Sequence, residues 1–329
     1  MSTVDFDRDV SNSDGLKLGI IGPGKMGGNL ALQAHDKNTA VVGKARNKKQ
    51  ELEEKGIKVT YDYNTFAEIL GKPKIIYLSL PAGKTVDTVL DELLLYMDDG
   101  DVIMDGGNSF YMDSIEREKR LSEKNIYFLD CGTSVGIEEA RYGACFMVGG
   151  KIEGYKIAYP ILRKLALNDK ACIYTGKQGS GHFVKLVHNG IEFGMLQSIG
   201  EGVSLLVENN DFGLDLKSIF RNRSNGSVIR GWLVELIERG LKEQEDKGIS
   251  IQSYVEDTGE ENWLVMDAIN KEIPIPVISQ SIMELFQSRV RDNPTYKSIA
   301  LMRHGFGGHP FGKDEHIAEE RRASRIAKI

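Results

Sequence analysis

The first half of the chain repeats one pattern: a short apolar run, a polar turn, and a segment with helical spacing. The apolar runs are residues 16–21 (LKLGII), 40–42, 74–80 (KIIYLSL), 101–104, 126–129 and 144–148. Such runs, bounded by glycine, proline, asparagine or aspartate, are typical of strands buried on both faces of a sheet. Because strands that alternate with helices form βαβ units, the pattern predicts an α/β fold with a doubly wound, mainly parallel Rossmann-type sheet.

From Gly179 onward the strand pattern gives way to helices. The longest is expected over 179–202, with a continuation over 204–209. Further helices are expected over 227–239, 263–270 and 277–289, a solvated charged segment over 241–247, and an irregular glycine-rich segment over 303–309. The predicted organisation is therefore a disordered tail (1–15), a dinucleotide-binding domain (16–178), and an all-α substrate and dimerisation domain with a C-terminal tail (179–329).

A glycine motif follows the first predicted strand and opens a helix. Gly22 permits a tight turn, Gly24 allows the backbone to approach a pyrophosphate, and Gly27 allows the helix to pack on the strand. The helix N-terminus then faces the phosphates. We therefore expect Gly22, Gly24, Lys25, Met26 and Gly27 to bind a dinucleotide; a glycine-rich turn without a ligand is the alternative interpretation.

The turn after the second predicted strand bears on the choice of cofactor. Enzymes that use NAD usually carry an acid there, which binds the ribose 2′-hydroxyl. Here residues 43–49 are GKARNKK, and the first acid is Glu51. Arg46 can pair with a 2′-phosphate, since a guanidinium matches phosphate geometry. The turn favours NADP, with NAD as the alternative; a basic surface turn without this role remains a third interpretation.

Small polar residues follow several of the other predicted strands. In doubly wound sheets, ligands bind at the carboxyl ends of the strands. We therefore expect Leu80, Pro81 and Asn108 to contact the cofactor, and Asn108 and Ser134 to contact the substrate. Asn108 and Ser134 could instead be ordinary turn formers.

The central helix carries the strongest candidate chemistry. Lys185, Asn189 and Glu192 are four and three residues apart, so they share one helical face, with His188 beside them. An apolar stripe next to that face consists of Val184, Val187, Ile191 and Met195. One interpretation is a partly solvated helix with exposed charges. The other is that the amine, the amide and the carboxylate meet a polar ligand.

Composition excludes several function classes. The chain has 329 residues and a net charge of −6, which gives no electrostatic case for nucleic acid. No apolar run reaches the roughly 18 residues of a membrane span, and the polar N-terminus has no signal-peptide pattern. Cys131, Cys145 and Cys172 lack metal-type spacing, so we expect reduced core thiols, no metal site, and a cytoplasmic protein.

Six segments resemble the short class of decarboxylating 6-phosphogluconate dehydrogenases, within the β-hydroxyacid dehydrogenase superfamily. They are GIIGPGKMG (19–27), DGGNS (105–109), GTSVGIEEARYGACFMVGG (132–150), GHFVKLVHNGIEFGM (181–195), NGSVIRGWL (225–233) and RHGFGGH (303–309). DGGNS together with GHFVKLVHNGIE is specific to this family within the superfamily. The resemblance implies oxidation of 6-phosphogluconate at C3 with NAD(P), and then loss of C1 as CO2 to give ribulose 5-phosphate.

The resemblance also implies a role for each matching residue. Lys185 would act as general base and then as general acid, with Asn189 beside it, and Glu192 would protonate C1 of the enediol. The substrate would be held by Asn108, Ser134, Gly136, His188 and Asn189. Arg303 and His309 would reach the substrate of a neighbouring subunit. The implied assembly is a homodimer or homotetramer, with the C-terminal tail contributing to a neighbouring site.

Elementary chemistry agrees with the two central roles. To accept a hydroxyl proton, the Lys185 amine must be neutral, and burial beside apolar residues favours the neutral form. Once protonated, it can polarise the carbonyl of the β-keto acid, so decarboxylation needs no metal. Glu192, about two helical turns further on, can serve the other end of a small substrate.

Four positions depart from the family pattern around the substrate. Val135 replaces a usual glycine in the substrate loop, so its branched side chain is expected to crowd a ligand. Phe193 replaces a usual tyrosine, and Leu285 a usual phosphate-binding arginine, while Glu260 is a poor neighbour for a phosphate. Arg303 is left to bind that charge. The alternative function is therefore dehydrogenation of a related sugar acid or β-hydroxyacid, such as an unphosphorylated one. A cofactor-binding protein without turnover is a third hypothesis, but such a protein needs neither the amine nor the carboxyl of the central helix.

Overall fold

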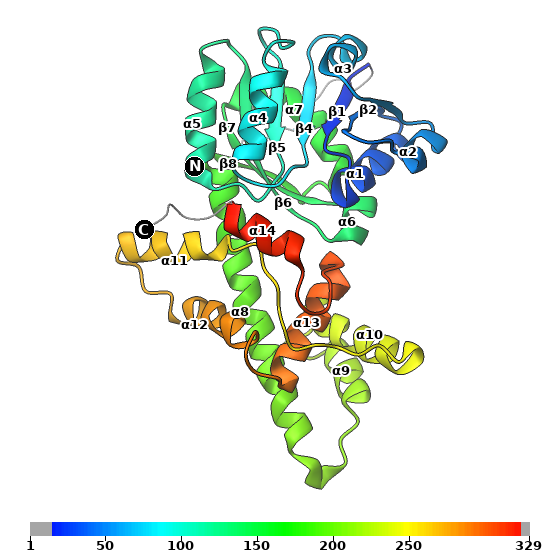
Figure 1. The fold of residues 1–329 in the computed structure, drawn as a ribbon, viewed down its shortest axis with the longest axis vertical. Helices are drawn as coiled ribbons and strands as arrows, with labels where there is room; N and C mark the ends of the chain where they lie inside the picture. Colours follow the sequence, from blue (N-terminus) through cyan, green and yellow to red (C-terminus); the bar gives the residue numbers. More distant parts are fainter. Residues whose placement is uncertain (1–14, 324–329) are drawn as a thin grey trace. The chain divides into compact units, whose positions relative to one another are not determined.

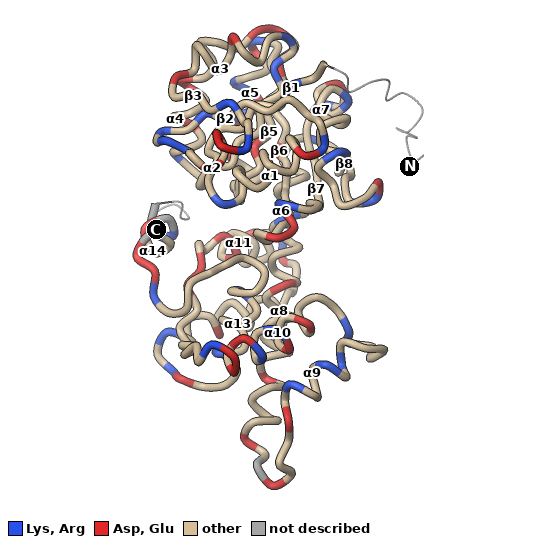
Figure 2. The backbone as a smooth tube through the Cα atoms, turned by 90° about the vertical axis from the view of Figure 1, so that its right-hand side faces the viewer, with Lys and Arg blue, Asp and Glu red and all other residues tan. Residues whose placement is uncertain are grey.

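The structure, a computed structural model, describes residues 15–323 (Figure 1). Two compact units divide between Lys185 and Leu186. This division falls inside one long helix, beyond residue 178, where the sequence places the domain boundary. The tail predicted over 1–15 lies outside the described residues except for Gly15. Acidic and basic residues are interspersed along both units, as Figure 2 shows.

The first unit contains one eight-stranded sheet with the order β3-β2-β1-β4-β5-β6-β7-β8. Its strands are β1 (Lys17–Ile21), β2 (Ala40–Lys44), β3 (Lys58–Thr60), β4 (Ile75–Leu78), β5 (Val102–Asp105), β6 (Tyr127–Ser134), β7 (Cys145–Gly150) and β8 (Cys172–Gly176). All neighbouring pairs are parallel except β6 and β7. The predicted α/β fold with a doubly wound sheet is confirmed, although the prediction omits the edge strands β3 and β8.

Helices cover both faces of this sheet. They are α1 (Lys25–Asp36), α2 (Gln50–Glu54), α3 (Tyr63–Leu70), α4 (Lys84–Leu93), α5 (Tyr111–Ser122), α6 (Ile137–Tyr142) and α7 (Ile152–Leu165). One core cluster joins the sheet to α1, α6 and α7 through Leu30, Ala140 and Tyr155. A second joins it to α3 and α4 through Phe66 and Leu90. Burial on both faces explains why β4 and β5 have no exposed residue.

The antiparallel pair β6–β7 lies one strand in from the edge strand β8. The sequence predicts a strand that ends at Leu129, but β6 continues to Ser134, because its last residues pair with β7. The pairing register joins Leu129 to Gly150 and Ser134 to Cys145. Ser134 is therefore the last residue of an extended strand.

The second unit is helical. Its helices are most of α8 (Ser180–Glu208), η2 (Asn210–Phe212), α9 (Leu216–Ser224), α10 (Trp232–Lys247), α11 (Glu261–Asn270), α12 (Pro276–Gln287), α13 (Pro294–Gly307) and α14 (Glu315–Ala323). One core cluster gathers α8, α9, α10 and α13 around Leu196, Phe220, Ile237 and Met302. The all-α prediction for this part of the chain is confirmed.

Several predicted boundaries in the second unit are wrong. Residues 227–231 are not helical, whereas 241–247 form the last turns of α10. Residues 303–307 are helical and belong to α13. That helix begins after Asn293, whose side chain accepts from the Tyr296 N–H, with Pro294 in the first turn. This is an ordinary N-terminal signal.

The apolar stripe predicted along the central helix does not face a core. Ile191 and Met195 are 53% and 50% exposed, and Val184 is also exposed. Lys185 and Asn189 are buried instead. The sequence suggests that this apolar stripe buries the polar side chains, but it does not. The polar residues Lys185 and Asn189 are themselves the ones that face protein.

Candidate active site

The loop between β1 and α1 has the shape that a dinucleotide pyrophosphate requires. Gly22 has a φ of 83°, and a side chain there would strike the Ser79 carbonyl. A Cβ on Gly27 would lie 2.7 Å from the Gly22 carbonyl oxygen, so this position is closed by packing. A Cβ on Gly24 would meet nothing within 4 Å. The open side of the loop is thus at Gly24, where the backbone can approach a ligand.

The first turn of α1 is also available to an anion. Its N-cap, Gly24, supplies no side-chain cap, and the turn carries no acid. The N–H groups of such a helix end, together with its dipole, favour phosphate. Lys25 is exposed at the first helical position, whereas Met26 packs against the core. These features fit the pyrophosphate of NAD(P).

Gly24→Ala should weaken dinucleotide binding, whereas Gly27→Ala should lower the stability of the fold. Gly24→Ala adds a methyl to open space, so the unfolding midpoint should stay within about 1 °C while dinucleotide Kd rises about tenfold or more. Gly27→Ala forces the methyl against backbone and should cost about 1–3 kcal/mol of stability. Thermal unfolding and fluorescence titration with NADP and NAD measure both quantities. Loss of stability in Gly24→Ala without loss of affinity would contradict this assignment.

The end of β2 presents basic side chains and no acid. Ala45 is buried where an acid for the 2′-hydroxyl is expected, and Arg46 is exposed beside it. The Lys44 amine lies 4.0 Å from the centre of the Tyr63 ring. Burial lowers the pKa of Lys44. The turn itself carries basic side chains, and the carboxylates of Glu92 and Asp62 lie near enough to the Lys44 amine to oppose that shift.

The loops after β4 and β5 meet the glycine loop at one edge of the sheet. The Leu80 side chain lies next to Gly22, and a Cβ on Gly107 would lie 2.6 Å from the Leu80 carbonyl oxygen. Pro81 and Asn108 are exposed in these loops. The structure thus brings the expected cofactor residues of β1, β4 and β5 together.

The loop after β6 carries Val135, whose branched side chain is expected to crowd a ligand. In the structure this side chain is half-buried and packs against the core of the first unit. Ser134 is half-buried at the strand end, and Gly136 is the extended N-cap of α6. The fold of the first unit therefore accommodates a valine at this position.

Asp130 in β6 holds the start of α8. Its carboxylate accepts from the Gly179 N–H and the His182 N–H, both at 2.8 Å. Burial raises the pKa of Asp130, and these hydrogen bonds oppose that shift. Close packing supports the same contact, because a Cβ on Gly132 would lie 2.6 Å from the Gly181 carbonyl oxygen and 2.7 Å from Lys185 Cβ. The backbone at Lys185 is therefore fixed against the sheet.

The expected catalytic side chains lie along α8. Lys185 and Asn189 are buried, 9% and 8% exposed, and His188 and Glu192 are half-buried. His188 Nδ1 lies 3.2 Å from Asn189 Oδ1 and 4.0 Å from Glu192 Oε2. An amine, an amide, an imidazole and a carboxyl thus occupy neighbouring turns of one helix. They can supply a base, an acid and two hydrogen-bonding groups.

Arg303 lies in a buried acidic environment. Its Nη2 donates to the Glu256 carbonyl oxygen at 2.9 Å, and its guanidinium lies 5.1 Å from the centre of the Phe193 ring. Burial raises the pKa of both Glu260 and Glu261, which repel each other and are partly stabilised by Arg303. The Arg303 guanidinium therefore already stabilises carboxylates of the protein, in addition to any ligand that it binds.

The substituted positions of the expected phosphate site are apolar in the structure. Phe193 and Leu285 belong to the core of the second unit. His309 follows α13, and its backbone carbonyl lies 2.8 Å from His304 Nδ1. Neither Phe193 nor Leu285 can donate a hydrogen bond, so they add nothing to the binding of a phosphate.

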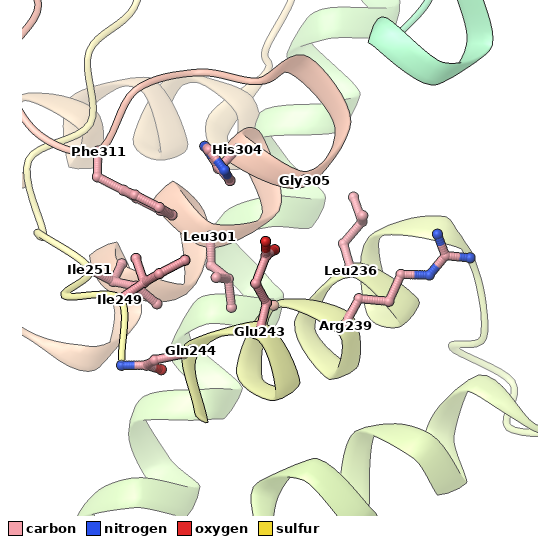
Figure 3. A pocket seen from close by; sticks show the side chains of 11 residues that line it. Leu236, Arg239, Glu243, Gln244, Ile249, Ile251, Leu301, His304, Gly305 and Phe311 are labelled. Carbon is pink, nitrogen blue, oxygen red and sulfur yellow. The ribbon is translucent and has the colours of Figure 1, made fainter. Parts of the chain in front are cut away.

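A pocket in the second unit lies between α10 and α13 (Figure 3). Its walls include Leu236 and Leu301, with Glu243 on one side and His304 stacked on Phe311 at 4.4 Å. None of the expected site residues lines it. The pocket is therefore separate from the groups that sequence identifies.

The three cysteines of the chain, Cys131, Cys145 and Cys172, are free. Cys131 and Cys172 are buried as expected, but Cys145, the first residue of β7, is exposed. Within residues 15–323, no three His, Cys, Asp or Glu side chains are grouped to hold a metal ion. Over the same residues, no helix has the length and apolar content needed to cross a membrane.

Two residues that hold this site are absent from the sequence-based assignment. Asp130 and His182 fix the start of α8, yet both lie inside apolar or glycine-rich runs that suggest only structure. The sequence does contain one signal for Asp130, because an acid next to an apolar strand is expected to be buried and a buried carboxylate requires hydrogen-bond partners.

Comparison with known families agrees with this geometry. Residues 17–176 match the NAD binding domain of 6-phosphogluconate dehydrogenase, and residues 181–329 match the C-terminal domain of 6-phosphogluconate dehydrogenase. Together the two matches cover nearly the whole chain. The second match begins at Gly181, one residue after the first residue of α8.

Individual relatives belong to the same group. YqeC of Bacillus subtilis, named as a candidate 6-phosphogluconate dehydrogenase, is 41% identical over 89% of this chain and 98% of its own. The NAD(+)-dependent decarboxylating 6-phosphogluconate dehydrogenase of Haloferax volcanii is 35% identical over 91% of this chain and 100% of its own. The Plasmodium falciparum 6-phosphogluconate dehydrogenase structure has a TM-score of 0.74 at 27% identity, covering 83% of this chain and 62% of that one. The chain belongs to the family of decarboxylating 6-phosphogluconate dehydrogenases.

Proposed function

We propose that this chain catalyses the NAD(P)-dependent oxidative decarboxylation of 6-phosphogluconate to ribulose 5-phosphate and CO2. The observation that carries the proposal is the buried Lys185 in α8, with Asn189 one turn and Glu192 two turns further along the same helix. The glycine loop between β1 and α1 supports the binding of the dinucleotide. When bound, the nicotinamide supplies the hydride acceptor.

Lys185 acts as a base and then as an acid in this proposal. Its neutral amine takes the proton of the C3 hydroxyl, which makes the hydride at C3 a better leaving group. The resulting ammonium then donates a hydrogen bond to the C3 carbonyl of the β-keto acid. That bond stabilises the negative charge that develops on the oxygen as the C1–C2 bond breaks and C1 leaves as CO2, and the ammonium proton passes to this oxygen to give the enediol.

Glu192 completes the reaction on the enediol. Its carboxyl proton goes to the carbon that bore the lost carboxylate, which is C1 of the product, while Lys185 takes back the proton of the enediol hydroxyl, and ribulose 5-phosphate results. His188, 4.0 Å from Glu192 Oε2, supports the acid's orientation. Asn189, Asn108, Ser134 and Gly136 are proposed to hold the hydroxyl and carboxylate groups of the substrate.

NADP is the proposed cofactor, with NAD as the alternative. Exposed Arg46 and buried Ala45 support NADP, because the turn offers a cation for a 2′-phosphate and no acid for a 2′-hydroxyl. The Haloferax volcanii relative is named as NAD(+)-dependent, and the Plasmodium falciparum structure is named with NADP+. The preference therefore needs its own measurement.

Arg46→Ala should discriminate between the two cofactors. Removal of a charge-assisted hydrogen bond costs about 1.5–3 kcal/mol, so KM for NADP should rise about ten- to hundredfold. KM for NAD should change less than about twofold, since NAD carries no 2′-phosphate. Lys48→Ala, in the same exposed turn, is the matched control. Equal effects of Arg46→Ala on both cofactors would remove Arg46 from this role.

A second candidate substrate is an unphosphorylated sugar acid. The apolar Phe193 and Leu285 and the carboxyls around Arg303 favour it, because they weaken a site for a phosphate dianion. A panel of 6-phosphogluconate, gluconate and short β-hydroxyacids, followed by NAD(P)H absorbance and CO2 release, separates the candidates. Turnover of gluconate with inert 6-phosphogluconate would overturn the first proposal. Oxidation of every substrate without CO2 would exclude decarboxylation.

A homodimer or homotetramer is proposed for the assembly, in the cytoplasm. Eight exposed large apolar side chains in the second unit support it, because burying apolar surface favours contacts between subunits. They are Ile191, Met195, Met266, Ile269, Val277, Met283, Phe286 and Val290. The proposed contribution of Arg303 and His309 to a neighbouring site depends on this assembly. The end of the C-terminal tail lies outside the described residues.

A further inference from the structure

A buried histidine that the proposed chemistry does not use lies one turn before Lys185. His182 is 2% exposed. Its Nδ1 lies 2.7 Å from Ser114 Oγ in α5, and its Nε2 lies 3.0 Å from the Asp105 carbonyl oxygen at the end of β5. A carbonyl oxygen can only accept, so Nε2 carries a proton. In the neutral ring, Nδ1 then accepts from the Ser114 hydroxyl.

Asp105 shapes the loop that carries Asn108. Its carboxylate accepts from the Gly107 N–H at 3.1 Å and from the Ser109 hydroxyl at 2.7 Å. These two residues flank Asn108, which is exposed between them. The loop is therefore held on both sides of the amide, and the Asp105 backbone is the point where His182 contacts it.

The helix on the other side of this contact is also fixed. The Asp130 carboxylate accepts from the N–H groups at the start of α8, and Gly132 allows the helix to press on β6 at Lys185. These contacts hold α8 to β6 and not to β5. The imidazole of His182 adds a direct bond from α8 to the end of β5, and so to the loop with Asn108.

We propose that His182 is a positioning residue, whose Nε2–H bond to the Asp105 carbonyl sets the distance between the Lys185 amine and the Asn108 amide. The inference rests on the proposed function, in which Lys185 is the base and Asn108 binds cofactor and substrate. A misplacement of about 1 Å can cost about a hundredfold in rate. The expected signature is therefore a loss in kcat with intact binding.

Two amide substitutions separate the two bonds of the ring. In His182→Gln the amide nitrogen reaches the position of Nε2, so it can still donate to Asp105. In His182→Asn the amide ends near the position of Nδ1, so it keeps a bond to Ser114 and loses the bond to Asp105. We expect kcat to fall about a hundredfold in His182→Asn and less than about fivefold in His182→Gln, with KM for the sugar acid within about threefold in both.

Two further readouts distinguish positioning from damage to the fold. With substrate deuterated at C3, the isotope effect on kcat should rise in His182→Asn, because hydride transfer becomes rate-limiting. A smaller fraction of folded enzyme would lower kcat and leave the isotope effect unchanged. In cofactor-free protein, amide hydrogen exchange of residues 105–111 should be faster in His182→Asn than in His182→Gln.

The outcomes decide the inference independently of the substrate. Equal losses of kcat in the two variants, or unchanged exchange of residues 105–111 in His182→Asn, would overturn it. If wild-type enzyme turns over neither sugar acid, the proposed function fails, but the exchange comparison still tests the contact. Should His182→Asn not fold, Ser114→Ala provides the test, because it leaves the Asp105 bond in place. It should keep kcat within about fivefold, and a hundredfold loss would assign the positioning to Ser114 instead.

Discussion

Lys185→Met should lower kcat by about 10³- to 10⁴-fold, while the Kd for the dinucleotide changes less than about threefold. Methionine has nearly the length of lysine and keeps the side chain packed against β6, but it can neither accept nor donate the proton. The loss should appear in both oxidation and decarboxylation, because one amine serves both steps. Steady-state kinetics on the preferred sugar acid, with dinucleotide binding by fluorescence, measure the two quantities.

Two control variants sharpen this expectation. Lys177→Met removes an exposed amine just before α8, and kcat should stay within about twofold of wild type. Lys185→Arg keeps the charge but cannot become neutral at ordinary pH, so it should be nearly as inactive as methionine. An active Lys185→Arg enzyme would show that the residue binds substrate and is not the base.

Glu192→Gln should lower kcat by about 10²- to 10³-fold and change the stereochemistry of the product. Glutamine keeps the size and hydrogen bonding of the side chain but cannot give a proton to C1. The enediol would then be protonated by solvent on either face. In D2O, wild-type enzyme should place deuterium on one face of C1, whereas the variant should give a mixture, which NMR of ribulose 5-phosphate resolves.

The control for this variant lies on the same helix. Glu201 is an exposed carboxylate that accepts from Gln197 at 2.8 Å, so Glu201→Gln should leave kcat and stereochemistry unchanged. If Glu192→Gln retains a single deuterated face at C1, another group is the acid. His188, the neighbour of Glu192, would be the next residue to substitute.

Local pattern was sufficient for the parts of the fold that repeat. Apolar runs such as 74–80 could be assigned because central parallel strands are buried on both faces. The strand Lys58–Thr60 is too short for such a run, and β8 has an exposed residue on the sheet edge. Their place in the sheet depends on pairing with β2 and β7, which is not a local property of the sequence.

In the second unit, the local composition of two segments did not reveal that they are helical, because packing against other helices determines their structure. The charged segment 241–247 is the solvated end of α10, whose Leu236 and Ile237 are buried a turn earlier. The glycines of 303–309 suggested an irregular loop. However, a Cβ on Gly305 would lie 2.7 Å from Leu236, so this glycine serves close helix packing.

For the candidate site, motif spacing identified side chains but not what holds them. Lys185, Asn189 and Glu192 could be grouped because helical spacing is a local rule. The contacts of His182 with Asp105 and Ser114 join residues more than 60 positions apart in the chain, so no local pattern contains them. The role of Val135 likewise depended on the direction of its side chain, toward the core.

The helix α8 is uninterrupted from Ser180 to Glu208, so it fixes the distance and the angle between Lys185 and Glu192. The seven positions from Lys185 to Glu192 advance about 10.5 Å and rotate about 700°, within about 20° of two full turns. Inserting or deleting one residue in this interval would rotate one group about 100° away from the other. Loops elsewhere in the chain can lengthen without rotating these groups. The spacing between the two proton-transferring groups can change only by whole residues of the helix, so the carbon chain of the substrate must fit it.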